Sequence, residues 1–205
     1  MLEKFRMAGL LAAFALAAVA APAAAGTTVL TFDKKKDAKQ FDPIVGDWTV
    51  KNGIYGVKFK KEEPAFTLYK KDVGDIEATV IFRLSTIFQS AGALVRTSLT
   101  KNKKSAQGYF ISYLHGGNLA AGAVSVVSFD GMAAESLCQA QVTVPDPIGW
   151  QELVIGLKGS NFTISFNGKQ VCKFKNSKYK KGFFGLQSTG FKGSIFEIDE
   201  VVLEQ

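Results

Sequence analysis

Residues 150–171, WQELVIGLKGSNFTISFNGKQV, indicate the fold class of this chain. On either side of the turn at 158–161, apolar side chains occupy every second position. These positions are Leu153, Ile155, Leu157, Phe162, Ile164 and Phe166. A period of two is the spacing of a β-strand with one buried face. Asn167-Gly168 then supplies a dipeptide that favours two-residue hairpin turns. The stretch therefore predicts antiparallel strands joined by tight turns.

The same two signals recur along the rest of the chain. Residues 75–84 alternate in the same way, and Asn52-Gly53 and Asp130-Gly131 are further hairpin dipeptides. We expect other strands near 27–32, 47–51, 54–60, 64–69, 91–98, 107–114, 121–129, 137–144, 169–175, 182–189 and 194–203. No amphipathic helix is evident after residue 26. About a dozen short strands predict an all-β fold, an antiparallel two-sheet sandwich or a barrel.

The first 25 residues have the features of a signal peptide. Lys4 and Arg6 precede an apolar run at 8–21, and three alanines at 23–25 offer a small-residue cleavage site. The run is shorter than the ~20 residues that span a bilayer, and no second run follows, so no transmembrane anchor is predicted. We therefore expect a signal peptide at 1–25 and one β-sandwich domain at 26–205. This organisation predicts export, to the periplasm or the medium of a bacterium.

The few metal-ligating side chains limit the chemistry of the chain. With one His and two Cys, it lacks the ligands of the common zinc sites, and no Asp-rich calcium loop or phosphate-binding Gly-rich loop is present. The sequence therefore predicts no metal and no cofactor. An oxidising compartment favours a disulfide between Cys138 and Cys172, although two buried thiols too far apart to meet are the alternative.

The order of the motifs resembles the concanavalin A-like lectin and glucanase superfamily. The matching pieces are GDWTVKNG at 46–53, IEATVIFR at 76–83, AGALVR at 91–96, GYF at 108–110, the stretch at 150–171, GLQ at 185–187 and FEIDEV at 196–201. Within that superfamily the chain is similar to laminin G-like and 3-keto-disaccharide hydrolase-like domains. The resemblance implies a jelly-roll sandwich with one concave sheet, in a superfamily whose members commonly bind or cleave carbohydrates.

The resemblance also suggests which residues would contact a sugar. It puts Arg83 and Arg96 on the concave sheet, with Tyr109, Tyr113 and Gln187 on strands near them. Aromatic faces stack on the apolar faces of sugars, while Arg and amide groups hydrogen-bond their hydroxyls. We predict these five as carbohydrate-binding residues. The alternative is an arginine paired with a carboxylate on a solvated face, and tyrosines that fill the sandwich.

The chain departs from catalytic patterns where they need titratable groups. Residues 197–200, EIDE, resemble the E-x-D-x-x-E strand of family 16 glucanases, but Val202 stands where the third acid belongs. The L-Q-x-H-G segment of 3-keto-disaccharide hydrolases has Thr189 in place of His, and their G-Y-E has Phe110 in place of the acid. The lone His115 is expected in an exposed turn. No catalytic residue is predicted, since glycoside cleavage usually needs two facing carboxylates.

Lysine clusters give the chain a net charge of +7. They lie at 34–39, 58–61, 70–71, 101–104 and 173–181. Lysines can guard edge strands against aggregation, or they can attract an acidic polysaccharide, a lipopolysaccharide or an anionic lipid surface. Export and the absence of a recognition motif speak against nucleic acid. The leading hypothesis is an exported, non-catalytic carbohydrate-binding module. Its alternatives are a glycoside-cleaving enzyme of the 3-keto-disaccharide hydrolase type, and a structural or protein-interaction domain.

Overall fold

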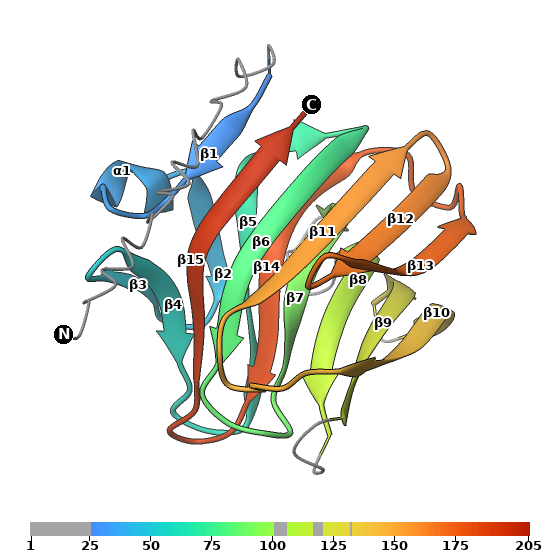
Figure 1. Ribbon diagram of the computed structural model, residues 1–205. Helices are drawn as coiled ribbons and strands as arrows, with labels where there is room; N and C mark the ends of the chain where they lie inside the picture. The colour runs from blue at the N-terminus through green and yellow to red at the C-terminus, as the bar shows by residue number, and fades with distance from the viewer. Residues whose placement is uncertain (1–25, 101–105, 117–120, 132) are drawn as a thin grey trace, which may run out of the picture.

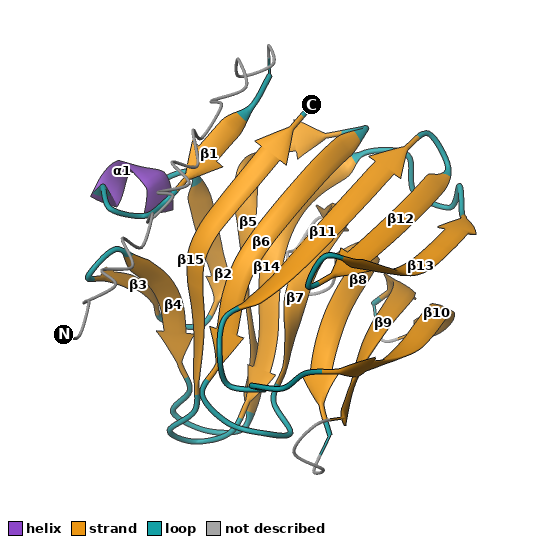
Figure 2. Ribbon diagram, viewed as in Figure 1, coloured by secondary structure: helices purple, strands orange, loops and turns teal. Residues whose placement is uncertain are grey.

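A computed structural model describes residues 26–100, 106–116, 121–131 and 133–205 as two antiparallel sheets packed face to face (Figures 1 and 2). The sheet at the front of Figure 1, here sheet A, runs β13 (Lys169–Lys175), β12 (Asn161–Phe166), β11 (Gln151–Lys158), β6 (Ile76–Leu84), β15 (Ile195–Glu204), β4 (Ile54–Lys58) and β3 (Trp48–Lys51), with β1 (Thr28–Leu30) also paired to β15. Behind it, sheet B runs β10 (Ala133–Thr143), β9 (Ala121–Asp130), β8 (Ala106–His115), β7 (Ser90–Leu99), β14 (Gly182–Gly190), β5 (Glu63–Val73) and β2 (Phe41–Val45).

The fold confirms the predicted all-β jelly-roll sandwich. Two elements escaped the sequence reading: the edge strand β2, which contains Pro43, and the single helical turn α1 (Lys35–Ala38), which buries no residue. Proline cannot donate a ladder hydrogen bond, so it hides an edge strand from pattern analysis. The proposed signal peptide at 1–25 lies outside the described residues.

The core lies between the two sheets and consists of the inward half of each alternation. In β6, for example, Ile76, Ala78, Val80, Phe82 and Leu84 are buried, while the residues between them face solvent. Two of the three hairpin dipeptides also behave as predicted, whereas in Asp130-Gly131 only the glycine has a positive φ. Asn52 and Gly53 have φ of 52° and 77°, and Asn167 and Gly168 have 48° and 74°. Two successive positive φ values are the geometry of a type I′ turn.

The predicted disulfide forms and joins the two sheets at one side of the sandwich. Cys138 on β10 and Cys172 on β13 are bonded, with their Cα atoms 6.2 Å apart. Both strands are the outermost of their sheets on the same side. The bond therefore ties together two edges that share no ladder.

Candidate functional site

The five predicted carbohydrate-binding residues do not share one face, and the two tyrosines lie in the core. Tyr109 and Tyr113 are fully buried between the sheets. The Tyr109 hydroxyl donates to Asn176 Oδ1 at 2.7 Å and accepts the Tyr179 N–H at 3.0 Å. The Tyr113 ring stacks on Phe166, and burial raises the pKa of Tyr113 to about 12. The alternation of β8 turns both rings inward, so the core-filling alternative describes them correctly.

Arg96 is buried rather than displayed on a sheet face. Arg96 is 3% exposed, and its backbone has a φ of 48° at a bulge between Val95 and Ser98. The guanidinium donates to Gly74 O at 3.2 Å, to Tyr179 O at 3.0 Å and to Asp75 Oδ1 at 3.1 Å. A bulge interrupts the period of two and redirects the side chain. Arg96 thus braces the β5–β6 turn against the segment that follows β13.

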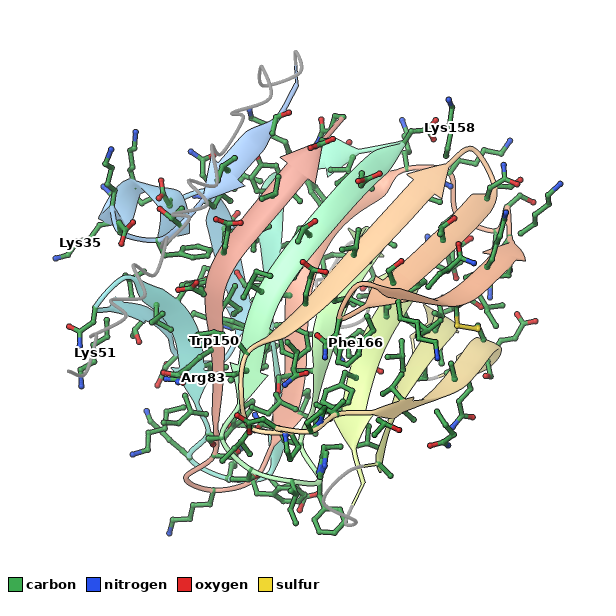
Figure 3. All side chains as sticks on the ribbon, in the orientation of Figure 1. Lys35, Lys51, Arg83, Trp150, Lys158 and Phe166 are labelled. Carbon is green, nitrogen blue, oxygen red and sulfur yellow. A yellow bond between two sulfur atoms is a disulfide. The ribbon has the colours of Figure 1, made fainter. Side chains whose placement is uncertain are left out.

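Arg83 lies on the outer face of sheet A, beside Trp150 (Figure 3). Its Nε donates to Glu197 Oε2 at 2.6 Å, and its guanidinium carbon lies 4.6 Å from the centre of the Trp150 ring. Glu197 is the direct cross-strand neighbour of Arg83, which explains why it is the partner. Arg83 and Gln187 are therefore on different sheets.

Gln187 is the predicted residue that faces a groove, on the outer face of sheet B. The groove has a volume of about 310 Å³. Three half-buried phenylalanines, Phe66, Phe110 and Phe129, lie around it with Gln187. The other lining residues are Pro64, Ala106, Val127 and Gly131. The lining comes from β5, β14, β8 and β9 and from the turn after β9, so the groove crosses most of the sheet.

The two central strands of this face, β14 and β7, carry both glycines and larger residues at their outward positions. In register, Gly185 of β14 lies between Leu68 and Leu94, and Gln187 lies between Phe66 and Gly92. The outer positions of the two central strands thus combine the glycines with Gln187 and Leu94, and Leu68 and Leu94 fill the space above Gly185. Of the described residues on these two strands, Gln187 is the one that lines the groove between the phenylalanines.

A polar row lies beside the apolar lining. From Gln187, the register continues through Gly92, Ser112 and Ser125 to Gln139 on β10. The hydroxyls of Ser112 and Ser125 are 3.0 Å apart. The face therefore offers amide and hydroxyl groups next to aromatic surface.

The sequence reading missed the phenylalanines of this groove, although a signal was present. Phe110 was read as a missing acid, yet it stands between the inward-facing Tyr109 and Ile111. An aromatic residue on the solvent side of an alternation is the informative departure, because such faces are usually polar.

His115 corrects another expectation, since it is not in an exposed turn. β8 extends to His115, which pairs with Gly122, and the parity of the strand turns the ring inward. The residue is 0% exposed, and within the described part of the chain neither ring nitrogen has a hydrogen-bond partner. His115 is therefore a core residue and contacts no described groove.

Carboxylates gather on sheet A. Among the described residues that line the sheet B groove, none is Asp or Glu. On the outer face of sheet A, Glu77 and Glu204 lie directly opposite each other on β6 and β15. They border a shallow groove of about 660 Å³ that also includes Gly156, Lys158 and Thr163. Of the residues described, no three His, Cys, Asp or Glu side chains are grouped so as to hold a metal ion.

The family follows from the sequence of the whole sandwich. Residues 27–201 match the model of the 3-keto-alpha-glucoside-1,2-lyase-like domain. The chain belongs to this family. No curated protein sequence matches the chain. Within the described part of this 3-keto-alpha-glucoside-1,2-lyase-like domain, no helix is long and apolar enough to cross a membrane.

The fold of the domain is similar to that of several solved structures. The carbohydrate binding module CBM66 from Bacillus subtilis has a TM-score of 0.63 at 15% identity, over 81% of this chain and 96% of the module. A Bacillus subtilis protein with a galectin-like fold has a TM-score of 0.67 at 11% identity, over 87% of this chain and 94% of that protein. A LamA variant from Z. galactanivorans, in complex with laminaritriose and laminaritetraose, has a TM-score of 0.65 at 12% identity, over 87% of this chain and 98% of the variant. At these identities the likeness shows the fold.

Proposed function

We propose that this chain is an exported protein that binds carbohydrate without cleaving it, through the groove on the outer face of sheet B. The observation that carries the proposal is the groove in which three phenylalanines lie around Gln187. Family membership and the carbohydrate-binding module among the similar structures support a sugar-related role. The Cys138–Cys172 disulfide is compatible with an extracytoplasmic location.

The groove supplies both kinds of contact that a sugar needs. A pyranose ring presents C–H groups that pack on the faces of Phe66 and Phe110. The amide of Gln187 can accept and donate, and so can the hydroxyls of Ser112 and Ser125 in the adjoining row. Fixed apolar walls with a few convergent polar groups are typical of small-molecule sites.

A lysine-rich segment beside the groove suggests that the ligand is acidic. Residues 176–181, which connect β13 to β14, contain three Lys and no Asp or Glu. The Tyr179 hydroxyl donates to the backbone oxygen of Phe129 at 2.8 Å, so this segment is held against the strand end that supplies a groove wall. We therefore propose an acidic polysaccharide or lipopolysaccharide as the preferred ligand, attracted by the lysines and positioned by the groove.

The test is binding of residues 26–205 to neutral and acidic polysaccharides at low and high salt. Phe110→Ala and Gln187→Ala should each weaken binding about tenfold, because each removes a wall or the central amide. Phe191→Ala is the matched control, since Phe191 is 42% exposed in the β14–β15 loop and does not line the groove. High salt should weaken binding to acidic ligands but not abolish it. Unchanged affinity in both groove variants would remove the site.

Glycoside cleavage remains a second candidate because of Glu77 and Glu204. Directly opposite residues have Cβ atoms about 4.5–5.5 Å apart, which permits the ~5–5.5 Å carboxyl separation of retaining glycosidases. If the chain hydrolyses a glycoside, Glu77→Gln should abolish product formation. Glu152→Gln is the control, because Glu152 lies on the same outer face of sheet A but on the neighbouring strand β11. Absence of product from the unmodified chain would leave binding as the function.

A further inference from the structure

The free edges of the two sheets differ in how they are protected. In sheet A, β13 carries Lys169, Lys173 and Lys175, and β3 has only four residues and ends in Lys51. In sheet B, β2 has five residues and contains Pro43. Charge, shortness and proline are the usual means of preventing a strand edge from pairing with another chain. Each of these three edges therefore has at least one form of protection.

Strand β10 has none of these protections along most of its length. It is 11 residues long and pairs with β9 on one side only, at the rim of sheet B (Figure 1). Residues 137–143, LCQAQVT, contain no charge. A bulge at Leu137 breaks the register, but Cys138 to Thr143 oppose β9 one to one. The disulfide from Cys138 to Cys172 holds the strand in place. This edge is thus a regular, uncharged template for another strand.

We propose that two copies of this chain associate through β10, with their free edges paired antiparallel about a twofold axis at Ala140. An axis perpendicular to the sheet reverses the strand direction and keeps each face on its own side. Opposed residues of the two copies must then lie on the same face of the sheet. An axis that passes through a residue meets this condition, because it pairs positions an even number of residues apart. Gln139, which is exposed on the outer face, meets the partner's Gln141, and their amides can hydrogen-bond.

A second copy suits this edge better than an unrelated strand does. The single charge of β10 is Glu135, five positions before the proposed axis. Two such glutamates would be separated by ten positions, about 34 Å at 3.4 Å per residue, so they would not repel strongly. On the inner face, Ala140 meets the partner's Ala140, which needs little space. Within β10, the edge is therefore complementary to itself in charge and size, whereas the lysines of β13 at the same rim repel their symmetry mates and weaken the association.

Such pairing would place two sheet B grooves on one face of a continuous sheet. A polysaccharide could then contact both grooves, and the second contact would be intramolecular. This consequence rests on the proposed function, whereas the association itself does not. The five residues of each chain that pair, 138–142, bury less surface than a standard interface, so the association should be weak and concentration-dependent.

The test is the mass of residues 26–205 by sedimentation equilibrium over a concentration series, without any glycan. The unmodified chain should approach twice the monomer mass as its concentration rises. The double variant Gln139→Lys and Gln141→Lys puts positive charges opposite each other across the axis, and should dimerise at least tenfold more weakly. The control Thr49→Lys adds a positive charge to the exposed edge strand β3, at the other end of sheet A, and should dimerise normally.

A second measurement guards against variants that fold poorly. Hydrogen exchange of the unmodified chain should slow with concentration for backbone amides within 138–143 that point away from β9. A chain that stays monomeric at every concentration would overturn the proposal. So would a double variant that is folded and still dimerises as tightly as the unmodified chain.

Discussion

Replacing Arg96 with alanine should destabilise the fold without altering the groove. Arg96 was a predicted ligand contact, and in the structure it is only 3% exposed. Its three hydrogen bonds join the β5–β6 turn to Tyr179, and Asp75 Oδ1 also accepts the N–H of Gly159 from the β11–β12 turn. The variant therefore breaks a brace among three separate segments.

The size of the effect follows from the partners. Two bonds from the guanidinium reach backbone oxygens, and hydrogen bonds that involve a charged group contribute about 1.5–3 kcal/mol each. The bond to Asp75 adds less, because that side chain is 58% exposed and screened by solvent. Release of a buried cation offsets part of the loss. We expect the free energy of unfolding to fall by about 2–4 kcal/mol, which lowers Tm by roughly 4–16 °C in a domain of this size.

The assay compares urea denaturation of the unmodified chain, Arg96→Ala and Arg96→Lys. Lysine keeps the charge but not the planar fork, so it should recover only part of the stability. At a temperature where all three are folded, polysaccharide affinity should be equal. A loss of binding in Arg96→Ala with stability within 1 kcal/mol of the unmodified chain would refute this reasoning and restore Arg96 as a ligand contact.

Three further predictions concern the core, the disulfide and the opposite face. Tyr113→Phe should raise the free energy of unfolding by about 1 kcal/mol, because the buried hydroxyl has no hydrogen-bond partner among the described residues. The pKa of Tyr113 is about 12 in the folded chain and ~10 in an unfolded one, so the free energy of unfolding should fall between about pH 10 and 12. This fall should be less steep in Tyr113→Phe. Denaturation at pH 7 and at about pH 11 measures both effects. Removing the disulfide with Cys138→Ser and Cys172→Ser should cost about 3–4 kcal/mol, since it closes 34 positions; an unchanged urea midpoint would contradict this. Trp150→Ala removes the contact with Arg83 and should cost about 0.5–1 kcal/mol without changing polysaccharide affinity, whereas a loss of affinity would move the site to sheet A.

The strands could be predicted because a half-buried strand alternates apolar and polar residues along its own sequence. Ile76 to Leu84 alternates without interruption, and the structure buries the predicted face. The hairpin dipeptide Asn167-Gly168 fixes a turn for a local steric reason. Neither inference needs knowledge of distant residues. β2 was missed because its partner β5, rather than its own sequence, makes it a strand.

The site was harder to predict because it depends on which residues become neighbours across strands. Arg96 has the expected motif position, but a bulge and the carbonyls of Gly74 and Tyr179 turn it inward. The disulfide is a favourable case, since compartment and an even count suffice to suggest it. The groove joins Phe66 to Phe110 across two intervening strands, a relation that no local pattern contains.

The contrast between the two outer faces explains why sheet B is the better place for a ligand. On sheet A, the outward positions of β6 include Glu77, Thr79 and Arg83, the polar pattern expected of a solvated face. On sheet B, a polar row from Gln187 to Gln139 lies beside apolar outward positions, which are Phe66, Leu68, Leu94, Phe110, Val127 and Phe129. An apolar row on a solvated face brings no benefit to folding, which already has its core between the sheets. Such a row acquires a physical reason once a ligand with its own apolar face covers it. A protein partner would favour a flat patch, whereas this face holds a groove of about 310 Å³, which favours a narrow ligand such as a glycan chain.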